Sequence, residues 1–386
     1  MSASPGHPGQ PGRAKEQERQ EQERQEQERG NQEHQERERQ DQEREQEALE
    51  LAAKAGIHRL RVPTPFHVGR VNAYLIEDSP LTLVDSGPNS AKALDELELA
   101  LNGHGHAIED LELLIITHQH VDHFGLAATL ARRSGAEVAA LDRLAPYLAD
   151  YAHESELDGE FARRAMLANR VPAAVVDGLR AEAASFRGWG EAIEVDRPLE
   201  RGSLLTLAGR TLRTLHRPGH SPSDTVFLDE SRAILLTGDH LLRNISSNAL
   251  LARPLPPAPN SVPEHPDPPP MEGRPAPLVD YIASLERTRA MELSLLLPGH
   301  GPPITDHVPL IDERRRLHER RARKIAKVIA AGPLSAHEIA CELWGSVAVT
   351  QAYLTLSEVL GHIDLLLRDG LVEELRGGGI STFAAI

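Results

Sequence analysis

The stretch LELLIITHQHVDH, residues 111–123, decides the fold, because a buried strand runs in it directly into four metal-competent side chains. Its first seven residues form a short apolar run, the pattern of a strand covered on both faces. His118 and His120 stand two residues apart, so an extended segment directs both to the same side. Asp122 and His123 follow where the chain turns into a helix predicted at Phe124–Ser134, and they can face a different point.

Three further apolar strands are predicted to end in the same chemistry. Each is followed by a glycine and then by a histidine or an aspartate: Thr211–His216 by Gly219-His220, Ala233–Thr237 by Gly238-Asp239, and Leu293–Leu297 by Gly299-His300. In layered α/β folds, ligands collect where strands end and loops begin. The pattern therefore predicts that seven side chains from four strand ends assemble into one site.

The residue types at these positions suit two metal ions. The seven are His118, His120, Asp122, His123, His220, Asp239 and His300. The first histidine pair would hold one ion and leave a second for the Asp-His pair, and the two histidines from later strand ends would each complete one shell. Asp239 could bridge both ions, because a carboxylate has two oxygens. Imidazoles and carboxylates with open positions suit catalytic zinc and, less selectively, iron or manganese.

The charge balance of such a site favours hydrolysis. Two divalent ions would carry +4, and Asp122, Asp239 and one hydroxide would supply −3, which leaves a positive charge where an oxyanion develops. Two ions about 3.5–4 Å apart would lower the pKa of a shared water and polarise a substrate oxygen. The sequence thus predicts attack by a metal-bridging hydroxide, with Asp122 or a nearby histidine moving protons.

Outward from this stretch, strands alternate and interleave with helices. Strands are predicted at Ile57–Thr64, Val71–Glu77 and Leu81–Val84, followed by a helix that Asn89 caps. Residues 143–190 are rich in alanine and helical in character. The alternation predicts an α/β layered domain.

The residue pattern changes beyond the last of the four strand ends, from buried strands to charged and amphipathic helices. Asp312–Ala331 is predicted to be a charged, Arg-rich helix, and Ser335–Trp344 and Ala352–Arg368 are predicted amphipathic helices. A strand, a glycine turn and a second strand complete the chain. Two helices followed by a hairpin suggest a winged-helix module, so the expected domains are 1–50, 51–305 and 306–386.

Composition excludes several classes of protein. The 386 residues exceed one ordinary domain, and a formal charge of −16 repels phosphate backbones. The single cysteine, Cys341, rules out an internal disulfide and a Cys-rich zinc module. The start lacks a secretory apolar stretch, and no run reaches the roughly 18–20 apolar residues that a bilayer requires. A cytoplasmic protein without a membrane segment is expected, and the 19 histidines need an explanation.

The N-terminal tail has a composition of its own. Residues 1–47 hold 8 basic and 13 acidic residues and lack leucine, isoleucine and valine. EQERQ repeats at 16–20 and 21–25, and a five-residue step turns identical residues around a helix, so no apolar face forms. A mostly disordered, solvated tail is expected, with a coiled-coil or partner-binding role as the alternative.

Residues 118–123, together with His220, Asp239 and His300, resemble the metallo-β-lactamase superfamily over roughly residues 57–305. The resemblance implies a four-layer αββα sandwich with metals at one edge. By position it assigns the first ion to His118, His120 and His220. The second falls to Asp122, His123 and His300, and Asp239 bridges.

The same resemblance orders the functions. A bridging aspartate is typical of the glyoxalase-II, lactonase and nuclease types, so a small ester, thioester or lactone is the leading substrate class and β-lactams fall in rank. A β-lactamase-like endoribonuclease and a single-iron sulfur oxygenase of the same fold are the alternatives. A small molecule is the expected partner, and a homodimer is left open.

Weaker candidates surround this set. Asp85, at the end of LTLVD, resembles a residue that orients the metal ligands, with a simple turn carboxylate as the alternative. His67, His240 and Asn244 could line the substrate site. GHGH at 103–106 is expected to be a loop, with a second metal site at His104 and His106 as the minor alternative.

Charge in the C-terminal part argues against nucleic acid. Residues 307–331 hold 8 basic and 3 acidic residues, but residues 332–386 hold 2 and 7. The candidate recognition helix offers Arg368 against Glu358 and Asp364, and phosphate affinity needs clustered Lys and Arg. The module is expected to pack or to close a pocket.

Overall fold

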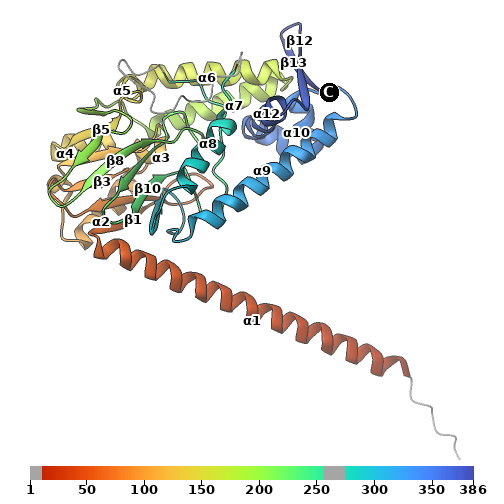
Figure 1. Cartoon of the computed structure of the whole chain (residues 1–386), viewed down its shortest axis with the longest axis horizontal. Coiled ribbons are helices and arrows are strands. Elements are labelled where there is room, and N and C mark those ends of the chain that lie inside the picture. Colours follow the sequence, from red (N-terminus) through yellow and green to blue (C-terminus); the bar gives the residue numbers. More distant parts are fainter. Residues whose placement is uncertain (1–10, 256–273) are drawn as a thin grey trace, which may run out of the picture. The chain divides into compact units, whose positions relative to one another are not determined.

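The computed structural model describes residues 11–255 and 274–386. The chain divides into two compact units, residues 1–50 and 51–386. The second unit holds two large sheets whose strands are mostly buried apolar runs, and its helices cover their outer faces (Figure 1). A third sheet has two strands.

The first sheet has six strands in the order β1-β2-β3-β4-β5-β6. Its strands are β1 (Ile57–Val62), β2 (Val71–Ile76), β3 (Thr82–Val84), β4 (Leu113–Ile116), β5 (Glu137–Leu141) and β6 (Arg197–Leu199). Strands β1 to β3 pair antiparallel, and β3 to β6 pair parallel. The predicted strand at 111–117 is therefore a central, fully buried strand, β4.

The second sheet has five strands in the order β11-β10-β9-β8-β7. Its strands are β7 (Leu204–Thr206), β8 (Thr211–His216), β9 (Thr225–Asp229), β10 (Ile234–Gly238) and β11 (Leu295–Pro298). Only β10 and β11 pair parallel, so these two strands end at the same edge. Prediction missed β6 and β7. Each has three residues, which is too short for a clear alternation of polar and apolar side chains.

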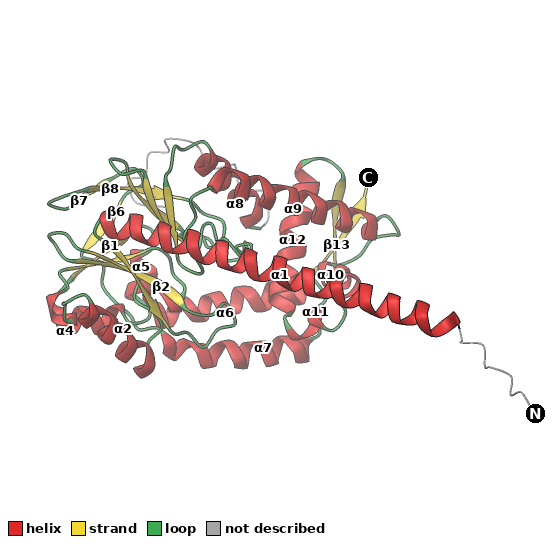
Figure 2. Cartoon of the chain, turned by 90° about the horizontal axis from the view of Figure 1, so that it is seen from below, coloured by secondary structure: helices red, strands yellow, loops and turns green. Residues whose placement is uncertain are grey.

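Helices complete a four-layer αββα arrangement (Figure 2). Those on the first sheet are α2 (Ala91–Gly103), α3 (Val121–Phe124) and α4 (Ala127–Ser134), with a short 3-10 turn at Ile108–Asp110. Buried Leu97 and Leu101 of α2 and Leu130 of α4 share one hydrophobic core with β2 and β4. On the second sheet, α8 (Pro277–Arg289) buries Tyr281 and Leu285 against β10 and β11.

Local sequence fixes the ends of these helices. Ser90, one residue after the predicted cap Asn89, caps α2, and its Oγ accepts a hydrogen bond from the Ala93 amide at 3.1 Å. The helix predicted at 124–134 begins earlier, at Val121, and is divided by Gly125 into α3 and α4. This earlier start places Asp122 and His123 on the first turn of a helix.

A third hydrophobic core joins α6 (Tyr151–Ala168) and α7 (Ala173–Phe186), which lie between β5 and β6 in the sequence, to the C-terminal helices. The C-terminal helices of this core are α9 (His307–Ile329), α10 (Ala336–Trp344), α11 (Val347–Thr350) and α12 (Ala352–Arg368). Helix α5 (Ala145–Ala149) packs in the core of the first sheet, and a 3-10 turn follows α7 at Arg187–Trp189. Met166 and Val176 of α6 and α7 are buried together with Ile325, Ile339 and Ile363 of the C-terminal helices. The hairpin β12 (Val372–Gly377) and β13 (Ile380–Ala385) follows.

The first unit is largely one helix, α1 (Pro11–Lys54), where prediction expects a mostly disordered tail. Residues 35–44 are all exposed. Glu and Arg pairs at helical spacing support it, as in Arg39–Glu43 at 3.6 Å and Asp41–Arg44 at 3.8 Å. Such exposed pairs stabilise a helix by roughly 0.2–0.5 kcal/mol each. The structure thus shows a continuous helix where a mostly disordered tail is expected, and the spacing of these ion pairs is consistent with that helix.

Candidate metal centre

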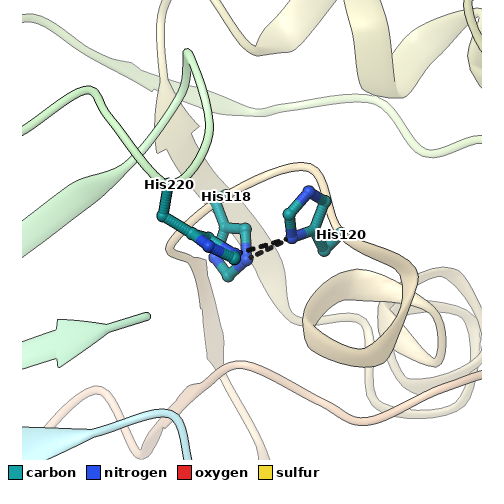
Figure 3. A group of neighbouring side chains, drawn as sticks. All are labelled: His118, His120 and His220. Atoms are coloured by element: carbon teal, nitrogen blue, oxygen red, sulfur yellow. Dashed lines mark hydrogen bonds between the residues drawn. The ribbon is translucent and has the colours of Figure 1, made fainter. Parts of the chain in front are cut away.

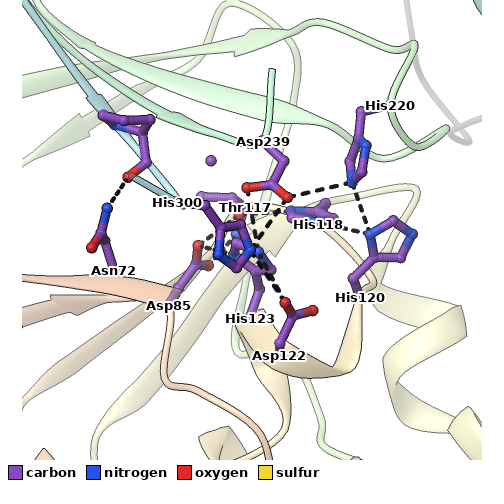
Figure 4. Close-up of polar contacts among 12 residues, drawn as sticks. Asn72, Asp85, Thr117, His118, His120, Asp122, His123, His220, Asp239 and His300 are labelled. Carbon is purple, nitrogen blue, oxygen red and sulfur yellow. Dashed lines mark hydrogen bonds and ion pairs between the residues drawn. The ribbon is translucent and has the colours of Figure 1, made fainter. Parts of the chain in front are cut away.

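The structure brings together all seven residues that the sequence singles out, and we call them the seven-residue centre. They are His118, His120, Asp122, His123, His220, Asp239 and His300. They come from the loops and the helix turn that follow β4, β8, β10 and β11, and their side chains converge (Figure 4). All are buried except His120, which is partly exposed.

Three histidines form one half of the centre (Figure 3). His118 Nε2 lies 3.1 Å from His120 Nδ1, and His220 Nε2 lies 2.9 Å from the same Nδ1. The three ligand atoms lie within 4.8 Å of one another. Three imidazole nitrogens at these separations match the ligand number of a catalytic zinc site with an open fourth position.

Asp122, His123 and His300 form the other half. His300 Nε2 lies 3.2 Å from Asp122 Oδ2, and His123 Nε2 lies 4.0 Å from that oxygen. Because α3 begins at Val121, the carboxylate and the imidazole of this turn both face His300.

Asp239 lies between the two halves. Its Oδ1 is 3.5 Å from His123 Nε2, and its Oδ2 is 3.6 Å from His220 Nε2 and 3.5 Å from His300 Nε2. One carboxylate therefore faces histidines of both groups with its two oxygens. This geometry suits a bridging ligand.

Several buried polar atoms of the centre are left without a hydrogen-bond partner among the described residues. They are His123 Nε2, His300 Nε2 and Asp239 Oδ1. Burying an unpaired polar group costs roughly 1–3 kcal/mol, so three at one point call for a ligand. Imidazole and carboxylate donors fit divalent zinc, iron or manganese, and the residues present therefore fit a metal centre.

The outer nitrogen of each deeply buried histidine is held by a defined acceptor. His118 Nδ1 lies 2.9 Å from Thr117 Oγ1, which donates to Asp85 Oδ2 at 2.8 Å. His123 Nδ1 lies 2.7 Å from the same carboxylate oxygen. This network assigns a proton to Nδ1 in both imidazoles and directs both Nε2 atoms inward. Such partners orient metal-binding histidines and fix their tautomer.

Backbone carbonyls do the same for the later histidines. His220 Nδ1 lies 2.9 Å from the Asn248 carbonyl, and His300 Nδ1 lies 2.9 Å from the Arg70 carbonyl. The loop after β10 and the loop before β2 therefore also orient the centre.

Two glycines make room for this arrangement. A Cβ on Gly299 would lie 2.5 Å from Asp239 Oδ1 and 2.6 Å from His123 Cε1. Gly238 has φ +47°, and a Cβ there would lie 2.8 Å from Thr117 Oγ1. The Gly-Asp and Gly-His pattern in the sequence thus has a steric cause, because the backbone must approach the ligands closely.

Burial and neighbouring charges set the protonation of the centre. Burial lowers the pKa of His120 to about 3, with His220 adding to the effect. Burial would raise the pKa of Asp239, but His300 and His123 hold it well below its ordinary value. Burial would likewise lower the pKa of His123, but Asp239, Asp85 and Asp122 raise it well above the usual range. The centre therefore presents ionised carboxylates that attract positive charge.

Asn72, Tyr74 and Thr117 hold the ligands or their loops in place, and they were not identified from the sequence. The Asn72 side chain donates to the carbonyls of Pro298 and Gly301 at 2.8 and 2.9 Å, and the Tyr74 hydroxyl donates to the Pro298 carbonyl at 2.8 Å. They clamp the loop that carries His300. The available signal was one polar residue in the otherwise apolar run VNAYLI.

The weaker candidates fall in different places. Asp85 is buried against His123 and has φ 60°. His240 is also buried, and its Nε2 lies 2.8 Å from Thr288 Oγ1 behind the centre. His67 and Asn244 are exposed on the loops before β2 and after β10. His216 packs inside the fold with its Nε2 2.9 Å from the Pro222 carbonyl, as a packing residue would.

No helix in residues 11–255 or 274–386 combines the length and the apolar character that crossing a bilayer would need.

Known proteins share both the sequence and the fold. Residues 67–332 match the family model of the metallo-beta-lactamase superfamily. The chain is 30% identical to the probable metallo-hydrolase YqjP of Bacillus subtilis over 80% of this chain and 91% of that protein. It is 24% identical to the hydroxyacylglutathione hydrolase GloC of Haemophilus influenzae over 43% of this chain and 64% of that protein.

A solved structure agrees with these relatives. A metallo-beta-lactamase family protein of Thermus thermophilus superposes with a TM-score of 0.68 at 25% identity, over 86% of this chain and 99% of that one. The family match spans well over half of the chain, and the fold, the histidine and aspartate clusters and the named relatives point the same way. The chain therefore belongs to the metallo-beta-lactamase superfamily and is a metal-dependent hydrolase of it.

Proposed function

We propose that this hydrolase binds two divalent metal ions, most simply zinc, and cleaves a small ester, thioester or lactone. His118, His120 and His220 would hold the first ion. Asp122, His123 and His300 would hold the second, and Asp239 would be shared. This assignment uses every residue of the seven-residue centre once and leaves no buried carboxylate of it unused.

The position of Asp239 carries the proposal. Its two oxygens face histidines of both groups at 3.5–3.6 Å, and the unpartnered atoms lie on both sides of it. A centre for one ion would not need a carboxylate that faces both groups. This observation favours two ions over the single-iron oxygenase alternative.

Metal ions bound here would lower the pKa of a water and polarise the substrate carbonyl. The residues of the chain supply the rest. Asp122 pairs with His300 through Oδ2 and has a second oxygen to accept a proton from the attacking water. Asp85 and Thr117 hold His118 and His123 in the tautomer that keeps both Nε2 lone pairs inward. The burial of the centre restricts competing water.

The substrate class rests on the chemistry of the centre and on a relative. The donor set provides no protein nucleophile, since the single cysteine, Cys341, lies far along the chain on α10. The relative named as a hydroxyacylglutathione hydrolase acts on an acyl compound. An acyl substrate that water attacks directly is consistent with both observations.

Three of the arginines of α9 are held by other parts of the fold, which weakens the case for RNA as the substrate. Arg314 is buried and donates to the carbonyls of Leu242, Arg243 and Ile245. Arg315 pairs with Glu286 at 2.7 Å, and Arg321 pairs with Glu358. These three arginines therefore stabilise the fold, whereas Arg316, Arg320, Arg323, Lys324 and Lys327 are exposed on the same helix and are the residues that phosphates could contact.

We further propose that residues 306–386 form a linker helix and a winged-helix module that packs against the catalytic domain of residues 51–305. The shared core of α6, α7, α10 and α12 supports this packing role. Arg314 also connects α9 to the loop after Asp239, so the module would help to hold the substrate side of the centre.

The test is a metal-restoration experiment on the full chain. Purified protein is stripped with a chelator, reloaded with zinc, iron or manganese, and assayed on thioester, lactone, β-lactam and phosphodiester substrates with metal content measured on the same samples. Restored acyl hydrolysis with two ions per chain at the centre supports the proposal. Activity that survives metal removal would contradict it, and one iron per chain with no hydrolysis would favour the oxygenase.

A further inference from the structure

A second group of histidines lies outside the seven-residue centre, at the end of the hairpin formed by β1 and β2. It consists of His58, Glu77, His104 and His106, which we call the surface cluster. His58 lies on β1, Glu77 directly follows β2, and the two remaining histidines follow α2 in the GHGH loop. The fold thus unites three chain segments around one carboxylate.

The distances among His58, Glu77 and His104 are those of ligands around a common point, and His106 lies beside the same carboxylate. His58 Nε2 lies 3.0 Å from Glu77 Oε2, and His106 Nε2 lies 3.6 Å from Glu77 Oε1. The rings of His58 and His104 are 4.4 Å apart between centroids. Ligand atoms of His58, Glu77 and His104 all lie within 4.8 Å of one another.

The charges around the surface cluster favour a cation. A surface cavity of about 700 Å³ adjoins it, and His106 lines this cavity together with Asp78, Glu109, Asp110 and Glu112. The three groups that act on the Glu77 carboxylate are histidines, and none is an arginine. Asp78 and Glu109 are paired with Arg210 and Arg133. Glu77, by contrast, has no arginine or lysine partner among the described residues, and its carboxylate is open to a metal ion.

One imidazole of the surface cluster, His104, is suited to bind as a neutral ligand. Partial burial, and after it the proximity of His58, lowers the pKa of His104. A neutral imidazole offers a nitrogen lone pair to a metal ion.

We propose that His58, Glu77, His104 and His106 bind one divalent transition-metal ion that is separate from the catalytic metals. Three imidazoles and one carboxylate are the donors that zinc, copper and nickel prefer, whereas calcium and magnesium take oxygen ligands. An ion here would tie the β1–β2 hairpin to the end of α2. The inference does not depend on the substrate or on the number of catalytic ions.

Equilibrium dialysis against zinc or nickel, followed by elemental analysis of the full chain, tests this site. The variant is His104→Gln/His106→Gln, and Glu77→Gln is a second variant that keeps the shape of the side chain. His153→Ala, an exposed histidine on α6, is the matched control. Wild type and control should hold one equivalent more than either variant, while all four hydrolyse substrate at equal rates because the cluster lies outside the catalytic machinery.

A spectroscopic measurement identifies the ligands independently. Copper(II) added to zinc-loaded protein should give an electron paramagnetic resonance signal with nitrogen hyperfine structure in wild type and control, and this signal should be lost in the His104→Gln/His106→Gln variant. Equal metal content in wild type and both variants, or a copper signal that the double substitution leaves unchanged, would overturn the inference. Loss of the extra equivalent in a protein without hydrolase activity would still support it and would count only against the proposed function.

Discussion

Two buried histidine groups in the second unit have nearly the same spacing but different chemistry. In the seven-residue centre, His118 and His120 approach within 3.1 Å. Between α9 and α12, His318 Nδ1 lies 3.2 Å from His362 Nε2, and Glu358 completes what we call the C-terminal triad. Histidine spacing alone therefore does not distinguish a metal site from a packing contact.

Partners and charges separate the two groups. His362 Nδ1 lies 2.6 Å from the Glu358 carbonyl, which can only accept, so His362 Nε2 accepts from His318 Nδ1. The Glu358 carboxylate is already paired with Arg321. Only His318 Nε2 of the triad is left without a partner among the described residues, beside the Tyr281 ring. In the centre, by contrast, two ionised carboxylates face only histidines.

Removing one carboxylate from each group tests most directly whether one is a metal site and the other a packing contact. Asp239→Ala should lower kcat/KM by at least ~10³-fold, because the site loses its shared ligand and several kcal/mol of transition-state stabilisation at about 1.4 kcal/mol per tenfold. Glu358→Ala should leave kcat/KM within a few fold. Steady-state kinetics with metal content on the same samples measures both effects, and equal losses in the two variants would refute the distinction.

The residues behind the ligands should matter less but in the same direction. Asp85→Asn keeps the shape of the side chain but weakens its hold on His123 and Thr117. We expect a fall of roughly 10–100-fold in metal affinity or activity. Competition with a chromogenic chelator measures the affinity. If only thermal stability changed, with affinity intact, Asp85 would be a turn carboxylate.

The C-terminal triad should affect stability and not metal binding. His318→Ala removes a buried donor and leaves His362 Nε2 unpaired, which should lower the free energy of unfolding by roughly 1–3 kcal/mol. Denaturant unfolding measures the loss, and elemental analysis should show unchanged metal content. A metal equivalent lost with His318 would make the triad a metal site after all.

Much of the fold and of the centre could be predicted from the sequence because the signals are local. Strand β4 is a continuous apolar run, and the ligands follow their strands within a few residues. The surroundings could not be predicted in this way. Asn72 reaches a loop more than 220 residues away, and His58 meets Glu77 and His104 only through tertiary folding.

Errors of prediction also have physical causes. The helix expected at 124–134 begins at Val121, since the ligand turn is itself helical and Gly125 divides it. The GHGH loop alone offers two histidines, and the carboxylate that makes it a candidate ligand group comes from another segment. Local patterns therefore determine which residues can bind a metal, and tertiary contacts determine which of them do so.

A last and smaller effect is the pH dependence of stability that Asp364 of α12 causes. Asp364 is buried and pairs with Arg274, and burial raises its pKa to about 7 despite that partner. The unfolded chain releases this proton near pH 4, so the contribution of Asp364 to stability falls as pH rises from about 4 to 7 and stays level above that range. Asp364→Asn should remove this slope, which for one proton is at most ~1.4 kcal/mol per pH unit. Urea unfolding of both proteins at pH 5, 6, 7 and 8 measures the difference, and parallel curves would show that Arg274 keeps Asp364 ionised throughout.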